Sequence, residues 1–328
     1  MKNNTSQKIL DYISKASDTS GTAPHELVDF LDIGERAVFK QLKKLYEEGK
    51  IDKIGRPPKV FYFIEKKEKP QQSFKISPKV EKIIEKNYLI ITPRGERKEG
   101  MEGFVYWCGK NNLPVEKTAL EYERTFKKYA KYKRAGFIDG TGKLKNTFGK
   151  VFLNKLFYLD FYSIERFGKT KLGSLLLYAK QSQNKTLIKE LIEIFKGKIE
   201  GFIKKYAIKA VAFVPPTVDR KVQLMRELEK NLKLALPKIS IGKIKTELIV
   251  PQKTLNKLED RIENARKTFF VDEARKFGNV VLIDDAVGSG STMNEIGAKI
   301  KEKGVCQRKL YGLSITGSFK GFEVISEV

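Results

Sequence analysis

The sequence predicts an α/β domain built on a parallel sheet, preceded by a small domain of helices and a hairpin. The apolar run Val280–Ile283 is typical of a strand that is covered on both faces. Earlier, the apolar run Ala210–Val214 precedes a helical pattern over 220–236, and a further strand is expected at Leu248–Val250. This alternation favours a parallel sheet. The first 66 residues instead show three helical patterns and then two short strand patterns.

Composition restricts the class of protein. A chain of 328 residues suggests two or three domains, and a hydrophobic content of 41% is enough to build cores. The sequence contains no apolar run of membrane-spanning length, and the polar stretch Met1–Ser20 lacks the apolar core of an export signal. We therefore expect a cytoplasmic protein. Cys108 and Cys306 lack metal-ligand spacing and are expected to be reduced packing residues, and a single histidine excludes a His-rich metal site.

Shifts in composition along the chain predict four segments. We expect a first domain over 1–66, a linker over 67–78, a basic middle region over 79–160 and the α/β domain over 161–328. The linker is expected because the stretch from Glu65 to Ser73 is charged, contains a proline and has almost no apolar residues.

The formal net charge of +25 is concentrated in the middle of the chain, since residues 66–210 hold 33 basic and 15 acidic residues. A polyanionic partner, such as nucleic acid or a phosphorylated substrate, is one implication, and a lysine-rich solvated surface is the alternative. A helix is expected over 116–133, with its regularly spaced aromatic residues in the core, although they could instead stack on bases. The turn Gly136–Gly142 is expected to be a hairpin, with a phosphate or metal loop as the alternative.

The N-terminal pattern resembles a known DNA-binding fold. Helical patterns over 6–16, 23–31 and 34–48 precede strand patterns at 51–54 and 60–64, and Gly-Arg-Pro-Pro-Lys…Phe-Tyr is similar to the wing of many bacterial regulators. The resemblance to a winged helix-turn-helix implies that the third helix enters the major groove. It also implies contacts from the wing to phosphate or the minor groove. The implied DNA-binding residues are Arg36, Lys40, Lys43, Lys44, Arg56 and Lys59. A structural or dimerising role is the alternative.

The stretch after Val280–Ile283 predicts a phosphate and sugar site. Asp284 and Asp285 stand at the end of the expected strand, where open α/β sheets bind ligands. A loop of small residues, 286–292, then opens a helical pattern that ends near Gly304. Free N–H groups at such a helix N-terminus, together with hydroxyl side chains, bind phosphate. The paired carboxylates suit ribose hydroxyls, or a Mg²⁺ ion shared with them. The residues therefore predict a ribose 5-phosphate site.

Two commoner phosphate loops are excluded by the same residues. A Walker A loop requires a lysine, and none stands between Asp285 and Thr292. A dinucleotide fingerprint requires a glycine three residues after Gly290, where this chain has Met293.

The stretch from Val280 to Thr292 closely resembles the PRPP-binding motif of type I phosphoribosyltransferases (PRPP is 5-phosphoribosyl 1-diphosphate). That motif is an apolar strand, two acids, small residues and then Ser/Thr-Gly-Ser-Thr. The resemblance implies that family's parallel sheet, with Asp284 and Asp285 as the catalytic pair on the ribose hydroxyls. It implies Mg²⁺ as cofactor, held by the same pair or only through PRPP. The residues implied to wrap the 5-phosphate are Ala286, Val287, Gly288, Ser289, Gly290, Ser291 and Thr292.

By the same resemblance, the loop after Ala210–Val214 corresponds to the pyrophosphate-binding loop. The implied pyrophosphate-side residues are Pro216, Thr217, Arg220, Lys221, Lys253 and Arg261. Within the family, the chain is similar to the competence-associated ComF type at Gln252, Leu255, Arg261, Asn264 and Phe269, and loosely along Tyr162–Lys180. It departs from that type at Val222–Met225, where ComF proteins have Arg-Gly-Phe-Asn-Gln. One extra residue also separates Leu255 from Arg261, and the usual N-terminal zinc ribbon is absent.

Three functions are compatible with these patterns. The first is a Mg²⁺-dependent phosphoribosyltransferase. The second is a regulator, because purine repressors also join a winged helix to a phosphoribosyltransferase fold and use PRPP as an effector. The third is a nucleic-acid uptake or processing factor that uses the basic middle region. The expected partners are PRPP or another phosphorylated ribose and DNA, with no membrane, and a homodimer is compatible with each function.

Overall fold

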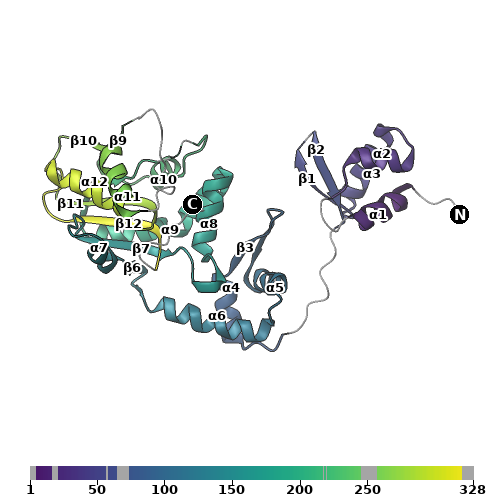
Figure 1. Cartoon of the computed structure of the whole chain (residues 1–328), viewed down its shortest axis with the longest axis horizontal. Helices are drawn as coiled ribbons and strands as arrows, with labels where there is room; N and C mark the ends of the chain where they lie inside the picture. The colour runs from purple at the N-terminus through teal and green to yellow at the C-terminus, as the bar shows by residue number, and fades with distance from the viewer. Residues whose placement is uncertain are drawn as a thin grey trace. The chain divides into compact units, whose positions relative to one another are not determined.

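The computed structural model of the chain describes residues 5–16, 21–56, 58–64, 74–216, 218, 220–244 and 257–319. The chain divides into two compact units, residues 1–74 and 75–328, which are described separately below (Figure 1).

The N-terminal unit consists of three helices followed by an antiparallel hairpin, in the order expected from the sequence. The elements are α1 (Thr5–Ala16), α2 (Pro24–Leu31), α3 (Glu35–Glu47), β1 (Asp52–Arg56) and β2 (Lys59–Phe63). One apolar side of each helix faces a common core that includes Ile9, Leu27, Val38 and Leu42, all fully buried. The apolar spacing of α3 predicted the burial of Val38, Leu42 and Leu45, but it wrongly included Tyr46, which is 40% exposed.

The second unit is a mixed α/β structure around one eight-stranded sheet. The strand order is β10-β9-β8-β11-β12-β7-β6-β5. The five inner strands from β9 to β7 are parallel, while β10 and the β6–β5 ribbon run antiparallel at the two edges. The strands are β5 (Lys133–Arg134), β6 (Phe137–Asp139), β7 (Lys155–Phe161), β8 (Ile208–Phe213), β9 (Lys238–Lys243), β10 (Phe269–Asp272), β11 (Asn279–Val287) and β12 (Leu310–Gly317).

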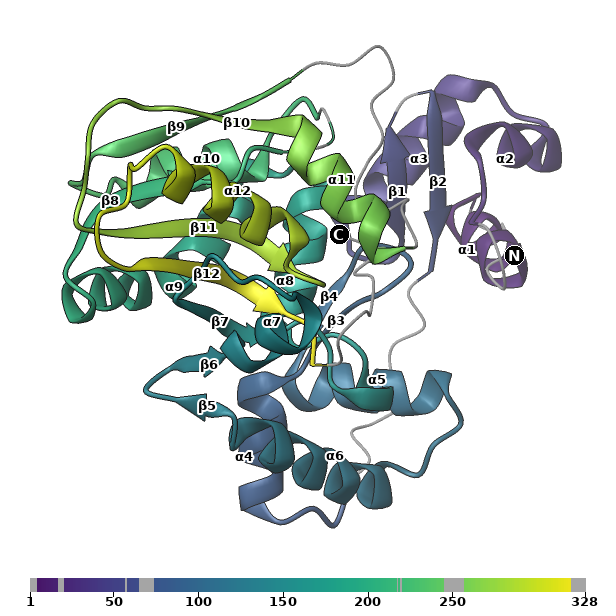
Figure 2. The same ribbon diagram turned by 60° about the vertical axis from the view of Figure 1, so that its left-hand side comes forward.

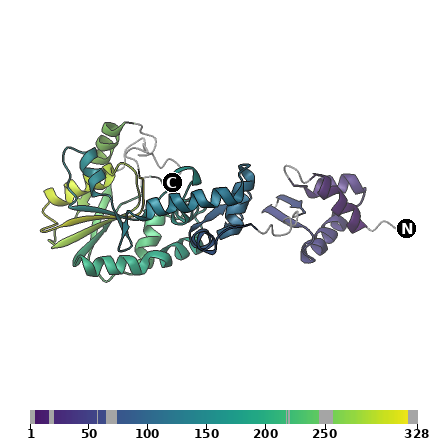
Figure 3. The ribbon, with the colours of Figure 1, turned by 90° about the horizontal axis from the view of Figure 1, so that it is seen from below.

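Helices cover both faces of this sheet, as Figures 2 and 3 show. One face packs against α8 (Lys171–Ser182), α9 (Lys185–Lys205) and α10 (Leu224–Leu232). The other packs against α7 (Thr141–Thr147), α11 (Leu258–Thr268) and α12 (Ser291–Glu302). The central strand β11 is buried on both faces, which explains its uninterrupted run of apolar residues.

Residues 75–130 form a helical part that shares the core of the sheet. It contains α4 (Pro78–Asn87), β3 (Leu89–Ile91), β4 (Arg97–Glu99), α5 (Gly100–Lys110) and α6 (Val115–Ala130), and a 3₁₀ turn follows β7 at Glu165–Phe167. Tyr122 and Tyr129 of α6 are buried in this core, as expected, whereas Tyr132 lies beyond the helix and is half-exposed.

The structure differs from the sequence-based expectations at several boundaries. The boundary expected at 160/161 falls inside β7, so the end of the basic middle region belongs to the sheet. On the side away from β11, β8 pairs with β9, whose sequence Lys-Ile-Ser-Ile-Gly-Lys mixes polar and apolar residues and forms no apolar run. The strand expected at Leu248–Val250 lies outside the described residues. The helix expected over 220–236 begins only at Leu224, and the Gly136–Gly142 turn is a hairpin end followed by α7.

Within the residues that the structure describes, no helix has the length and apolarity needed to cross a membrane.

Candidate functional site

The acid pair lies in the middle of the sheet, near the carboxyl end of β11. This strand is hydrogen-bonded to β8 on one side and β12 on the other, both parallel to it. The pattern of the strand places Asp284 and Asp285 on opposite faces, and both line one cavity. The strand itself continues to Val287, four residues beyond the expected apolar run.

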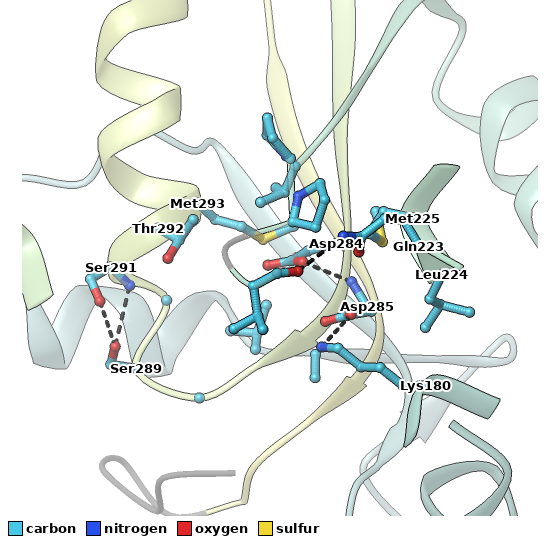
Figure 4. Close-up of a pocket in the computed structure, with 18 of the residues that line it drawn as sticks. Lys180, Gln223, Leu224, Met225, Asp284, Asp285, Ser289, Ser291, Thr292 and Met293 are labelled. Carbon is cyan, nitrogen blue, oxygen red and sulfur yellow. Dashed lines mark hydrogen bonds and ion pairs between the residues drawn. The ribbon is translucent and has the colours of Figure 1, made fainter. Parts of the chain in front are cut away.

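Asp285 is held by a lysine from another helix. The Nζ atom of Lys180, near the end of α8, lies 2.6 Å from Asp285 Oδ2. The Asp285 and Lys180 side chains are only 10% and 23% exposed, so water screens this ion pair less than a surface pair. Figure 4 shows Lys180 approaching Asp285 from the side opposite the phosphate loop.

Among the described residues, none forms an ion pair with Asp284 as Lys180 does with Asp285. Its Oδ1 atom accepts a hydrogen bond from the Asp285 backbone N–H at 2.8 Å. Burial, and then the negative charge of Asp285, raise the pKa of the Asp284 carboxyl to about 8. In the ligand-free site, a negative charge on Asp284 beside Asp285 is therefore disfavoured. A bound cation or a set of ribose hydroxyls would compensate the charge on both.

The loop after the acid pair has the geometry of an anion site. Gly290 has a φ of +89°, a left-handed conformation that glycine adopts without strain. Ser289 Oγ lies 2.7 Å from Ser291 Oγ and accepts from the Ser291 N–H at 3.3 Å. Helix α12 begins at Ser291, so the N–H groups of its first turn and its dipole are directed toward the cavity.

A second helix also begins at this cavity. The loop after β8 contributes Pro215, Pro216 and Arg220, and the first turn of α10 contributes Leu224 and Met225. Gln183, one turn after Lys180, accepts a hydrogen bond from the Val222 N–H at 2.9 Å and so fixes this loop. In Figure 4 the acid pair lies between the two helix beginnings.

Arg261 of α11 completes the cavity. Arg261 is 6% exposed and lines the same cavity as Asp284 and Gly288. Burial lowers the pKa of its guanidinium, which still remains far above neutral pH, so the group is a cation there. The cavity thus contains two carboxyl groups, three side-chain cations (Lys180, Arg220 and Arg261) and two helix N-termini.

Most of the residues predicted for the ligand site do line this one cavity. They are Pro216, Arg220, Arg261, Asp284, Asp285, Ala286, Val287, Gly288, Ser289, Gly290, Ser291 and Thr292. Lys221 is exposed and is not part of the cavity wall, because the chain turns at this point to enter α10. Thr217 and Lys253 lie outside the described residues, as do Gln252 and Leu255.

Sequence reasoning missed several residues of the wall, among them Lys180, Gln223, Leu224 and Met225. Lys180 is the last residue of the stretch Tyr162–Lys180 that loosely resembles ComF proteins, and the residues next to it in sequence do not indicate an acidic partner. Gln223, Leu224 and Met225 were expected inside a longer helix. The signal that could have located them is Pro215-Pro216, because prolines favour an extended segment before a helix N-terminus.

The residues predicted for DNA contact lie on the N-terminal unit. Arg36 and Lys40 are exposed on α3, and neither forms an ion pair with another described residue. Lys43 and Lys44 form wide pairs with Glu47 and Glu48 one turn later, at 3.8 and 3.9 Å. Arg56 and Lys59 flank the hairpin turn, and their side chains lie outside the description.

No residues gather as a complete metal centre in the described part of the chain, since no three His, Cys, Asp or Glu side chains converge. Asp284 and Asp285 are hard oxygen donors of the kind that Mg²⁺ takes. They would supply one or two ligands, and the other ligands would come from a bound substrate and water.

Comparison with known proteins gives little. No protein-family profile matches the chain, and no curated protein matches it. One solved structure that is similar in part is a crystal structure of adenine phosphoribosyltransferase, at 16% sequence identity over 44% of this chain and 78% of the other, with a TM-score of 0.28. A TM-score this low does not establish a shared fold.

The raised pKa of Asp284 predicts a pH-dependent stability. The folded Asp284 carboxyl keeps its proton up to about pH 8, whereas an unfolded aspartate loses it near pH 3.8. The stability that the protonated carboxyl contributes is therefore fully present below about pH 3.8 and is lost as the pH rises through about 8. We expect Asp284→Asn to raise the free energy of unfolding of the ligand-free protein by on the order of 1–3 kcal/mol near pH 9, and by little near pH 4. Thermal melting at both pH values measures this. Asp272→Asn, at an exposed position in β10, is the control, and a less stable Asp284→Asn at high pH would contradict the prediction.

Removing the Lys180 ammonium group should lower the free energy of unfolding, whereas Asp284→Asn should raise it. Lys180→Met leaves Asp285 beside a second carboxyl group in a largely buried position, and we expect a loss of about 1–3 kcal/mol of unfolding free energy at pH 7. Urea denaturation compares it with Lys180→Arg, which keeps the charge, and with Lys189→Met, at an exposed position on α9. Equal urea midpoints for Lys180→Met, Lys180→Arg and Lys189→Met would show that the Lys180–Asp285 ion pair does not stabilise the protein.

Proposed function

We propose that the second unit binds PRPP with Mg²⁺ and acts as a phosphoribosyltransferase of type I. The observation that carries this proposal is the pair of helix N-termini that open on one cavity with an acid pair between them. A ligand that fits must have anionic groups at two separate ends and hydroxyls between them. PRPP has this arrangement.

Each end of the ligand is assigned by the residues around it. The 5-phosphate lies in the loop Ala286–Thr292 at the beginning of α12. Asp284 and Asp285 would hold the ribose hydroxyls and, with them, Mg²⁺. The pyrophosphate lies against the Pro216–Arg220 loop, Arg261 and the beginning of α10. The carboxyl pair and the phosphate groups are thereby kept apart, which avoids their mutual repulsion.

The reaction proposed is a displacement at the ribose C1 atom. A nucleophilic atom of an acceptor forms a bond to C1 while the bond from C1 to the pyrophosphate oxygen breaks, and the leaving group takes the electron pair. Mg²⁺, when bound, offsets the charge of the leaving pyrophosphate. Arg220 and Arg261 are placed to stabilise the same developing charge, and the acid pair holds the ring in position through its hydroxyls.

The assignment to the ComF type is supported by fewer residues of the cavity than the general assignment to type I phosphoribosyltransferases. Of the five residues that carry the resemblance, two lie outside the described chain, and Arg261 is the one that reaches the cavity. Asn264 bonds to Thr268 within α11, and Phe269 is buried in the core. These two residues support the local fold and do not discriminate between kinds of acceptor.

The N-terminal unit favours a second role in DNA binding. Three helices and a hairpin agree with a winged helix, and α3 presents Arg36 and Lys40 to solvent. If both units act together, PRPP could serve as an effector of DNA binding in a regulator, instead of as a substrate. Release of pyrophosphate with a nucleobase present discriminates the enzyme from the regulator.

The PRPP site is tested by calorimetric titration of Mg²⁺–PRPP into the full-length protein. We expect saturable binding, and we expect Asp285→Asn to weaken it at least about 100-fold, because one of the two ribose contacts is lost and Lys180 loses its partner. Glu259→Gln, at an exposed position on α11, is the matched control. Equal affinity of Asp285→Asn and wild type would exclude the proposed position of the ribose.

DNA binding is tested on α3. We expect the double variant Arg36→Ala with Lys40→Ala to weaken binding to duplex DNA by about tenfold or more and to reduce its salt dependence, because two phosphate-contacting charges are removed. Fluorescence anisotropy at several salt concentrations measures both effects. Lys8→Ala with Lys15→Ala, on exposed positions of α1, is the control. An unchanged affinity of the α3 variant would remove this helix from the DNA interface.

A further inference from the structure

The basic middle region reaches the phosphate loop through α7. This short helix packs Leu144, which is fully buried, against Gly290. A Cβ atom placed on Gly290 would lie 2.5 Å from Leu144 Cδ2. Leu144 of α7 is therefore a close neighbour of the loop, although it lies outside the sequence motif of residues 280–292.

A lysine of the same helix contacts the beginning of the loop through one residue. Lys143 Nζ donates to the carbonyl oxygen of Ser318 at 3.2 Å, and it also contacts Ser318 Oγ. The Ser318 N–H in turn donates to Val287 O at 3.1 Å, and its hydroxyl lies 3.5 Å from Gly288 O. One ammonium group is thus fixed beside the loop by contacts to the chain that follows β12.

The stretch after α7 is attached to the other end of the loop. Asn294, in the first turn of α12, is 2% exposed. Its Oδ1 atom accepts from the Phe152 N–H at 2.9 Å, and its Nδ2 atom donates to Lys150 O at 3.0 Å. Residues 143–152 therefore contact Gly290 of the loop and Asn294 of α12 directly, and they reach the beginning of the loop through Ser318.

We propose that the segment 143–152 is a brace that positions the phosphate loop, with Lys143 of the segment and its partner Asn294 of α12 as the positioning residues. Lys143 adds positive potential behind a loop that receives a dianion, and Asn294 fixes the first turn of α12, whose N–H groups bind that anion. This inference rests on the proposed function. It gives the end of the basic middle region a specific role, in place of a general affinity for polyanions.

The test separates the two ends of the ligand. Ribose 5-phosphate probes the braced loop, and inorganic pyrophosphate with Mg²⁺ probes the opposite wall at Arg220 and Arg261. By calorimetry we expect Lys143→Met to weaken ribose 5-phosphate binding about tenfold and to leave pyrophosphate binding unchanged. Lys143→Arg should recover most of the loss, and Lys145→Met, at an exposed position of the same helix, should bind like wild type.

A general loss of folding would weaken both probes, so the difference between them distinguishes positioning from damage. If Lys143→Met binds ribose 5-phosphate with wild-type affinity, the proposed role of the segment 143–152 is wrong, and the proposed function is unaffected. Failure of the wild-type protein to bind ribose 5-phosphate, pyrophosphate or PRPP would instead overturn both proposals.

Discussion

The site depends on holding two adjacent carboxyl groups at the end of a buried strand. Asp284 and Asp285 are consecutive residues of β11, and the lysine that offsets their charge comes from α8, more than a hundred residues earlier. Lys180 neutralises Asp285, while Asp284 keeps its proton up to about pH 8. Such an arrangement costs stability in the absence of a ligand, which is common at functional sites and rare in purely structural cores.

The remaining features of the cavity follow from the sheet. Parallel strands bring the carboxyl ends of β8 and β11 to one edge, so the helices that follow them, on opposite faces of the sheet, both begin at that edge. Helix α12 begins after the short loop that follows β11, and the Val222 N–H just before α10 donates to Gln183. Two anion-binding ends are thereby placed around one acid pair. This geometry supports a ligand with separated phosphate groups more strongly than either helix could alone.

Local sequence predicted the motif because all of its parts are adjacent in the chain. The strand, the acid pair and the loop occupy residues 280–292, and short-range rules for strands, turns and helix beginnings apply to each. The acid at position 285 could be predicted as a ligand-binding residue, but its partner Lys180 could not, because the contact depends on how α8 packs against the sheet. The same holds for Asn294, whose amide bonds residues 150 and 152. Strand β9 was missed for a different reason, since its sequence Lys-Ile-Ser-Ile-Gly-Lys mixes polar and apolar residues and carries no apolar run.

The measurement that tests the central claim most directly is ³¹P NMR of Mg²⁺–PRPP during titration with the full-length protein. The 5-phosphate and the two pyrophosphate phosphorus atoms give separate signals, so both ends of the ligand are observed at once. The account predicts that all signals shift or broaden with one affinity in the wild-type protein. In Gly290→Ala, where the added methyl group meets Leu144, the 5-phosphate signal alone should lose its response. A response at only one end in the wild-type protein, or none, would contradict a cavity that binds two phosphate groups around the acid pair.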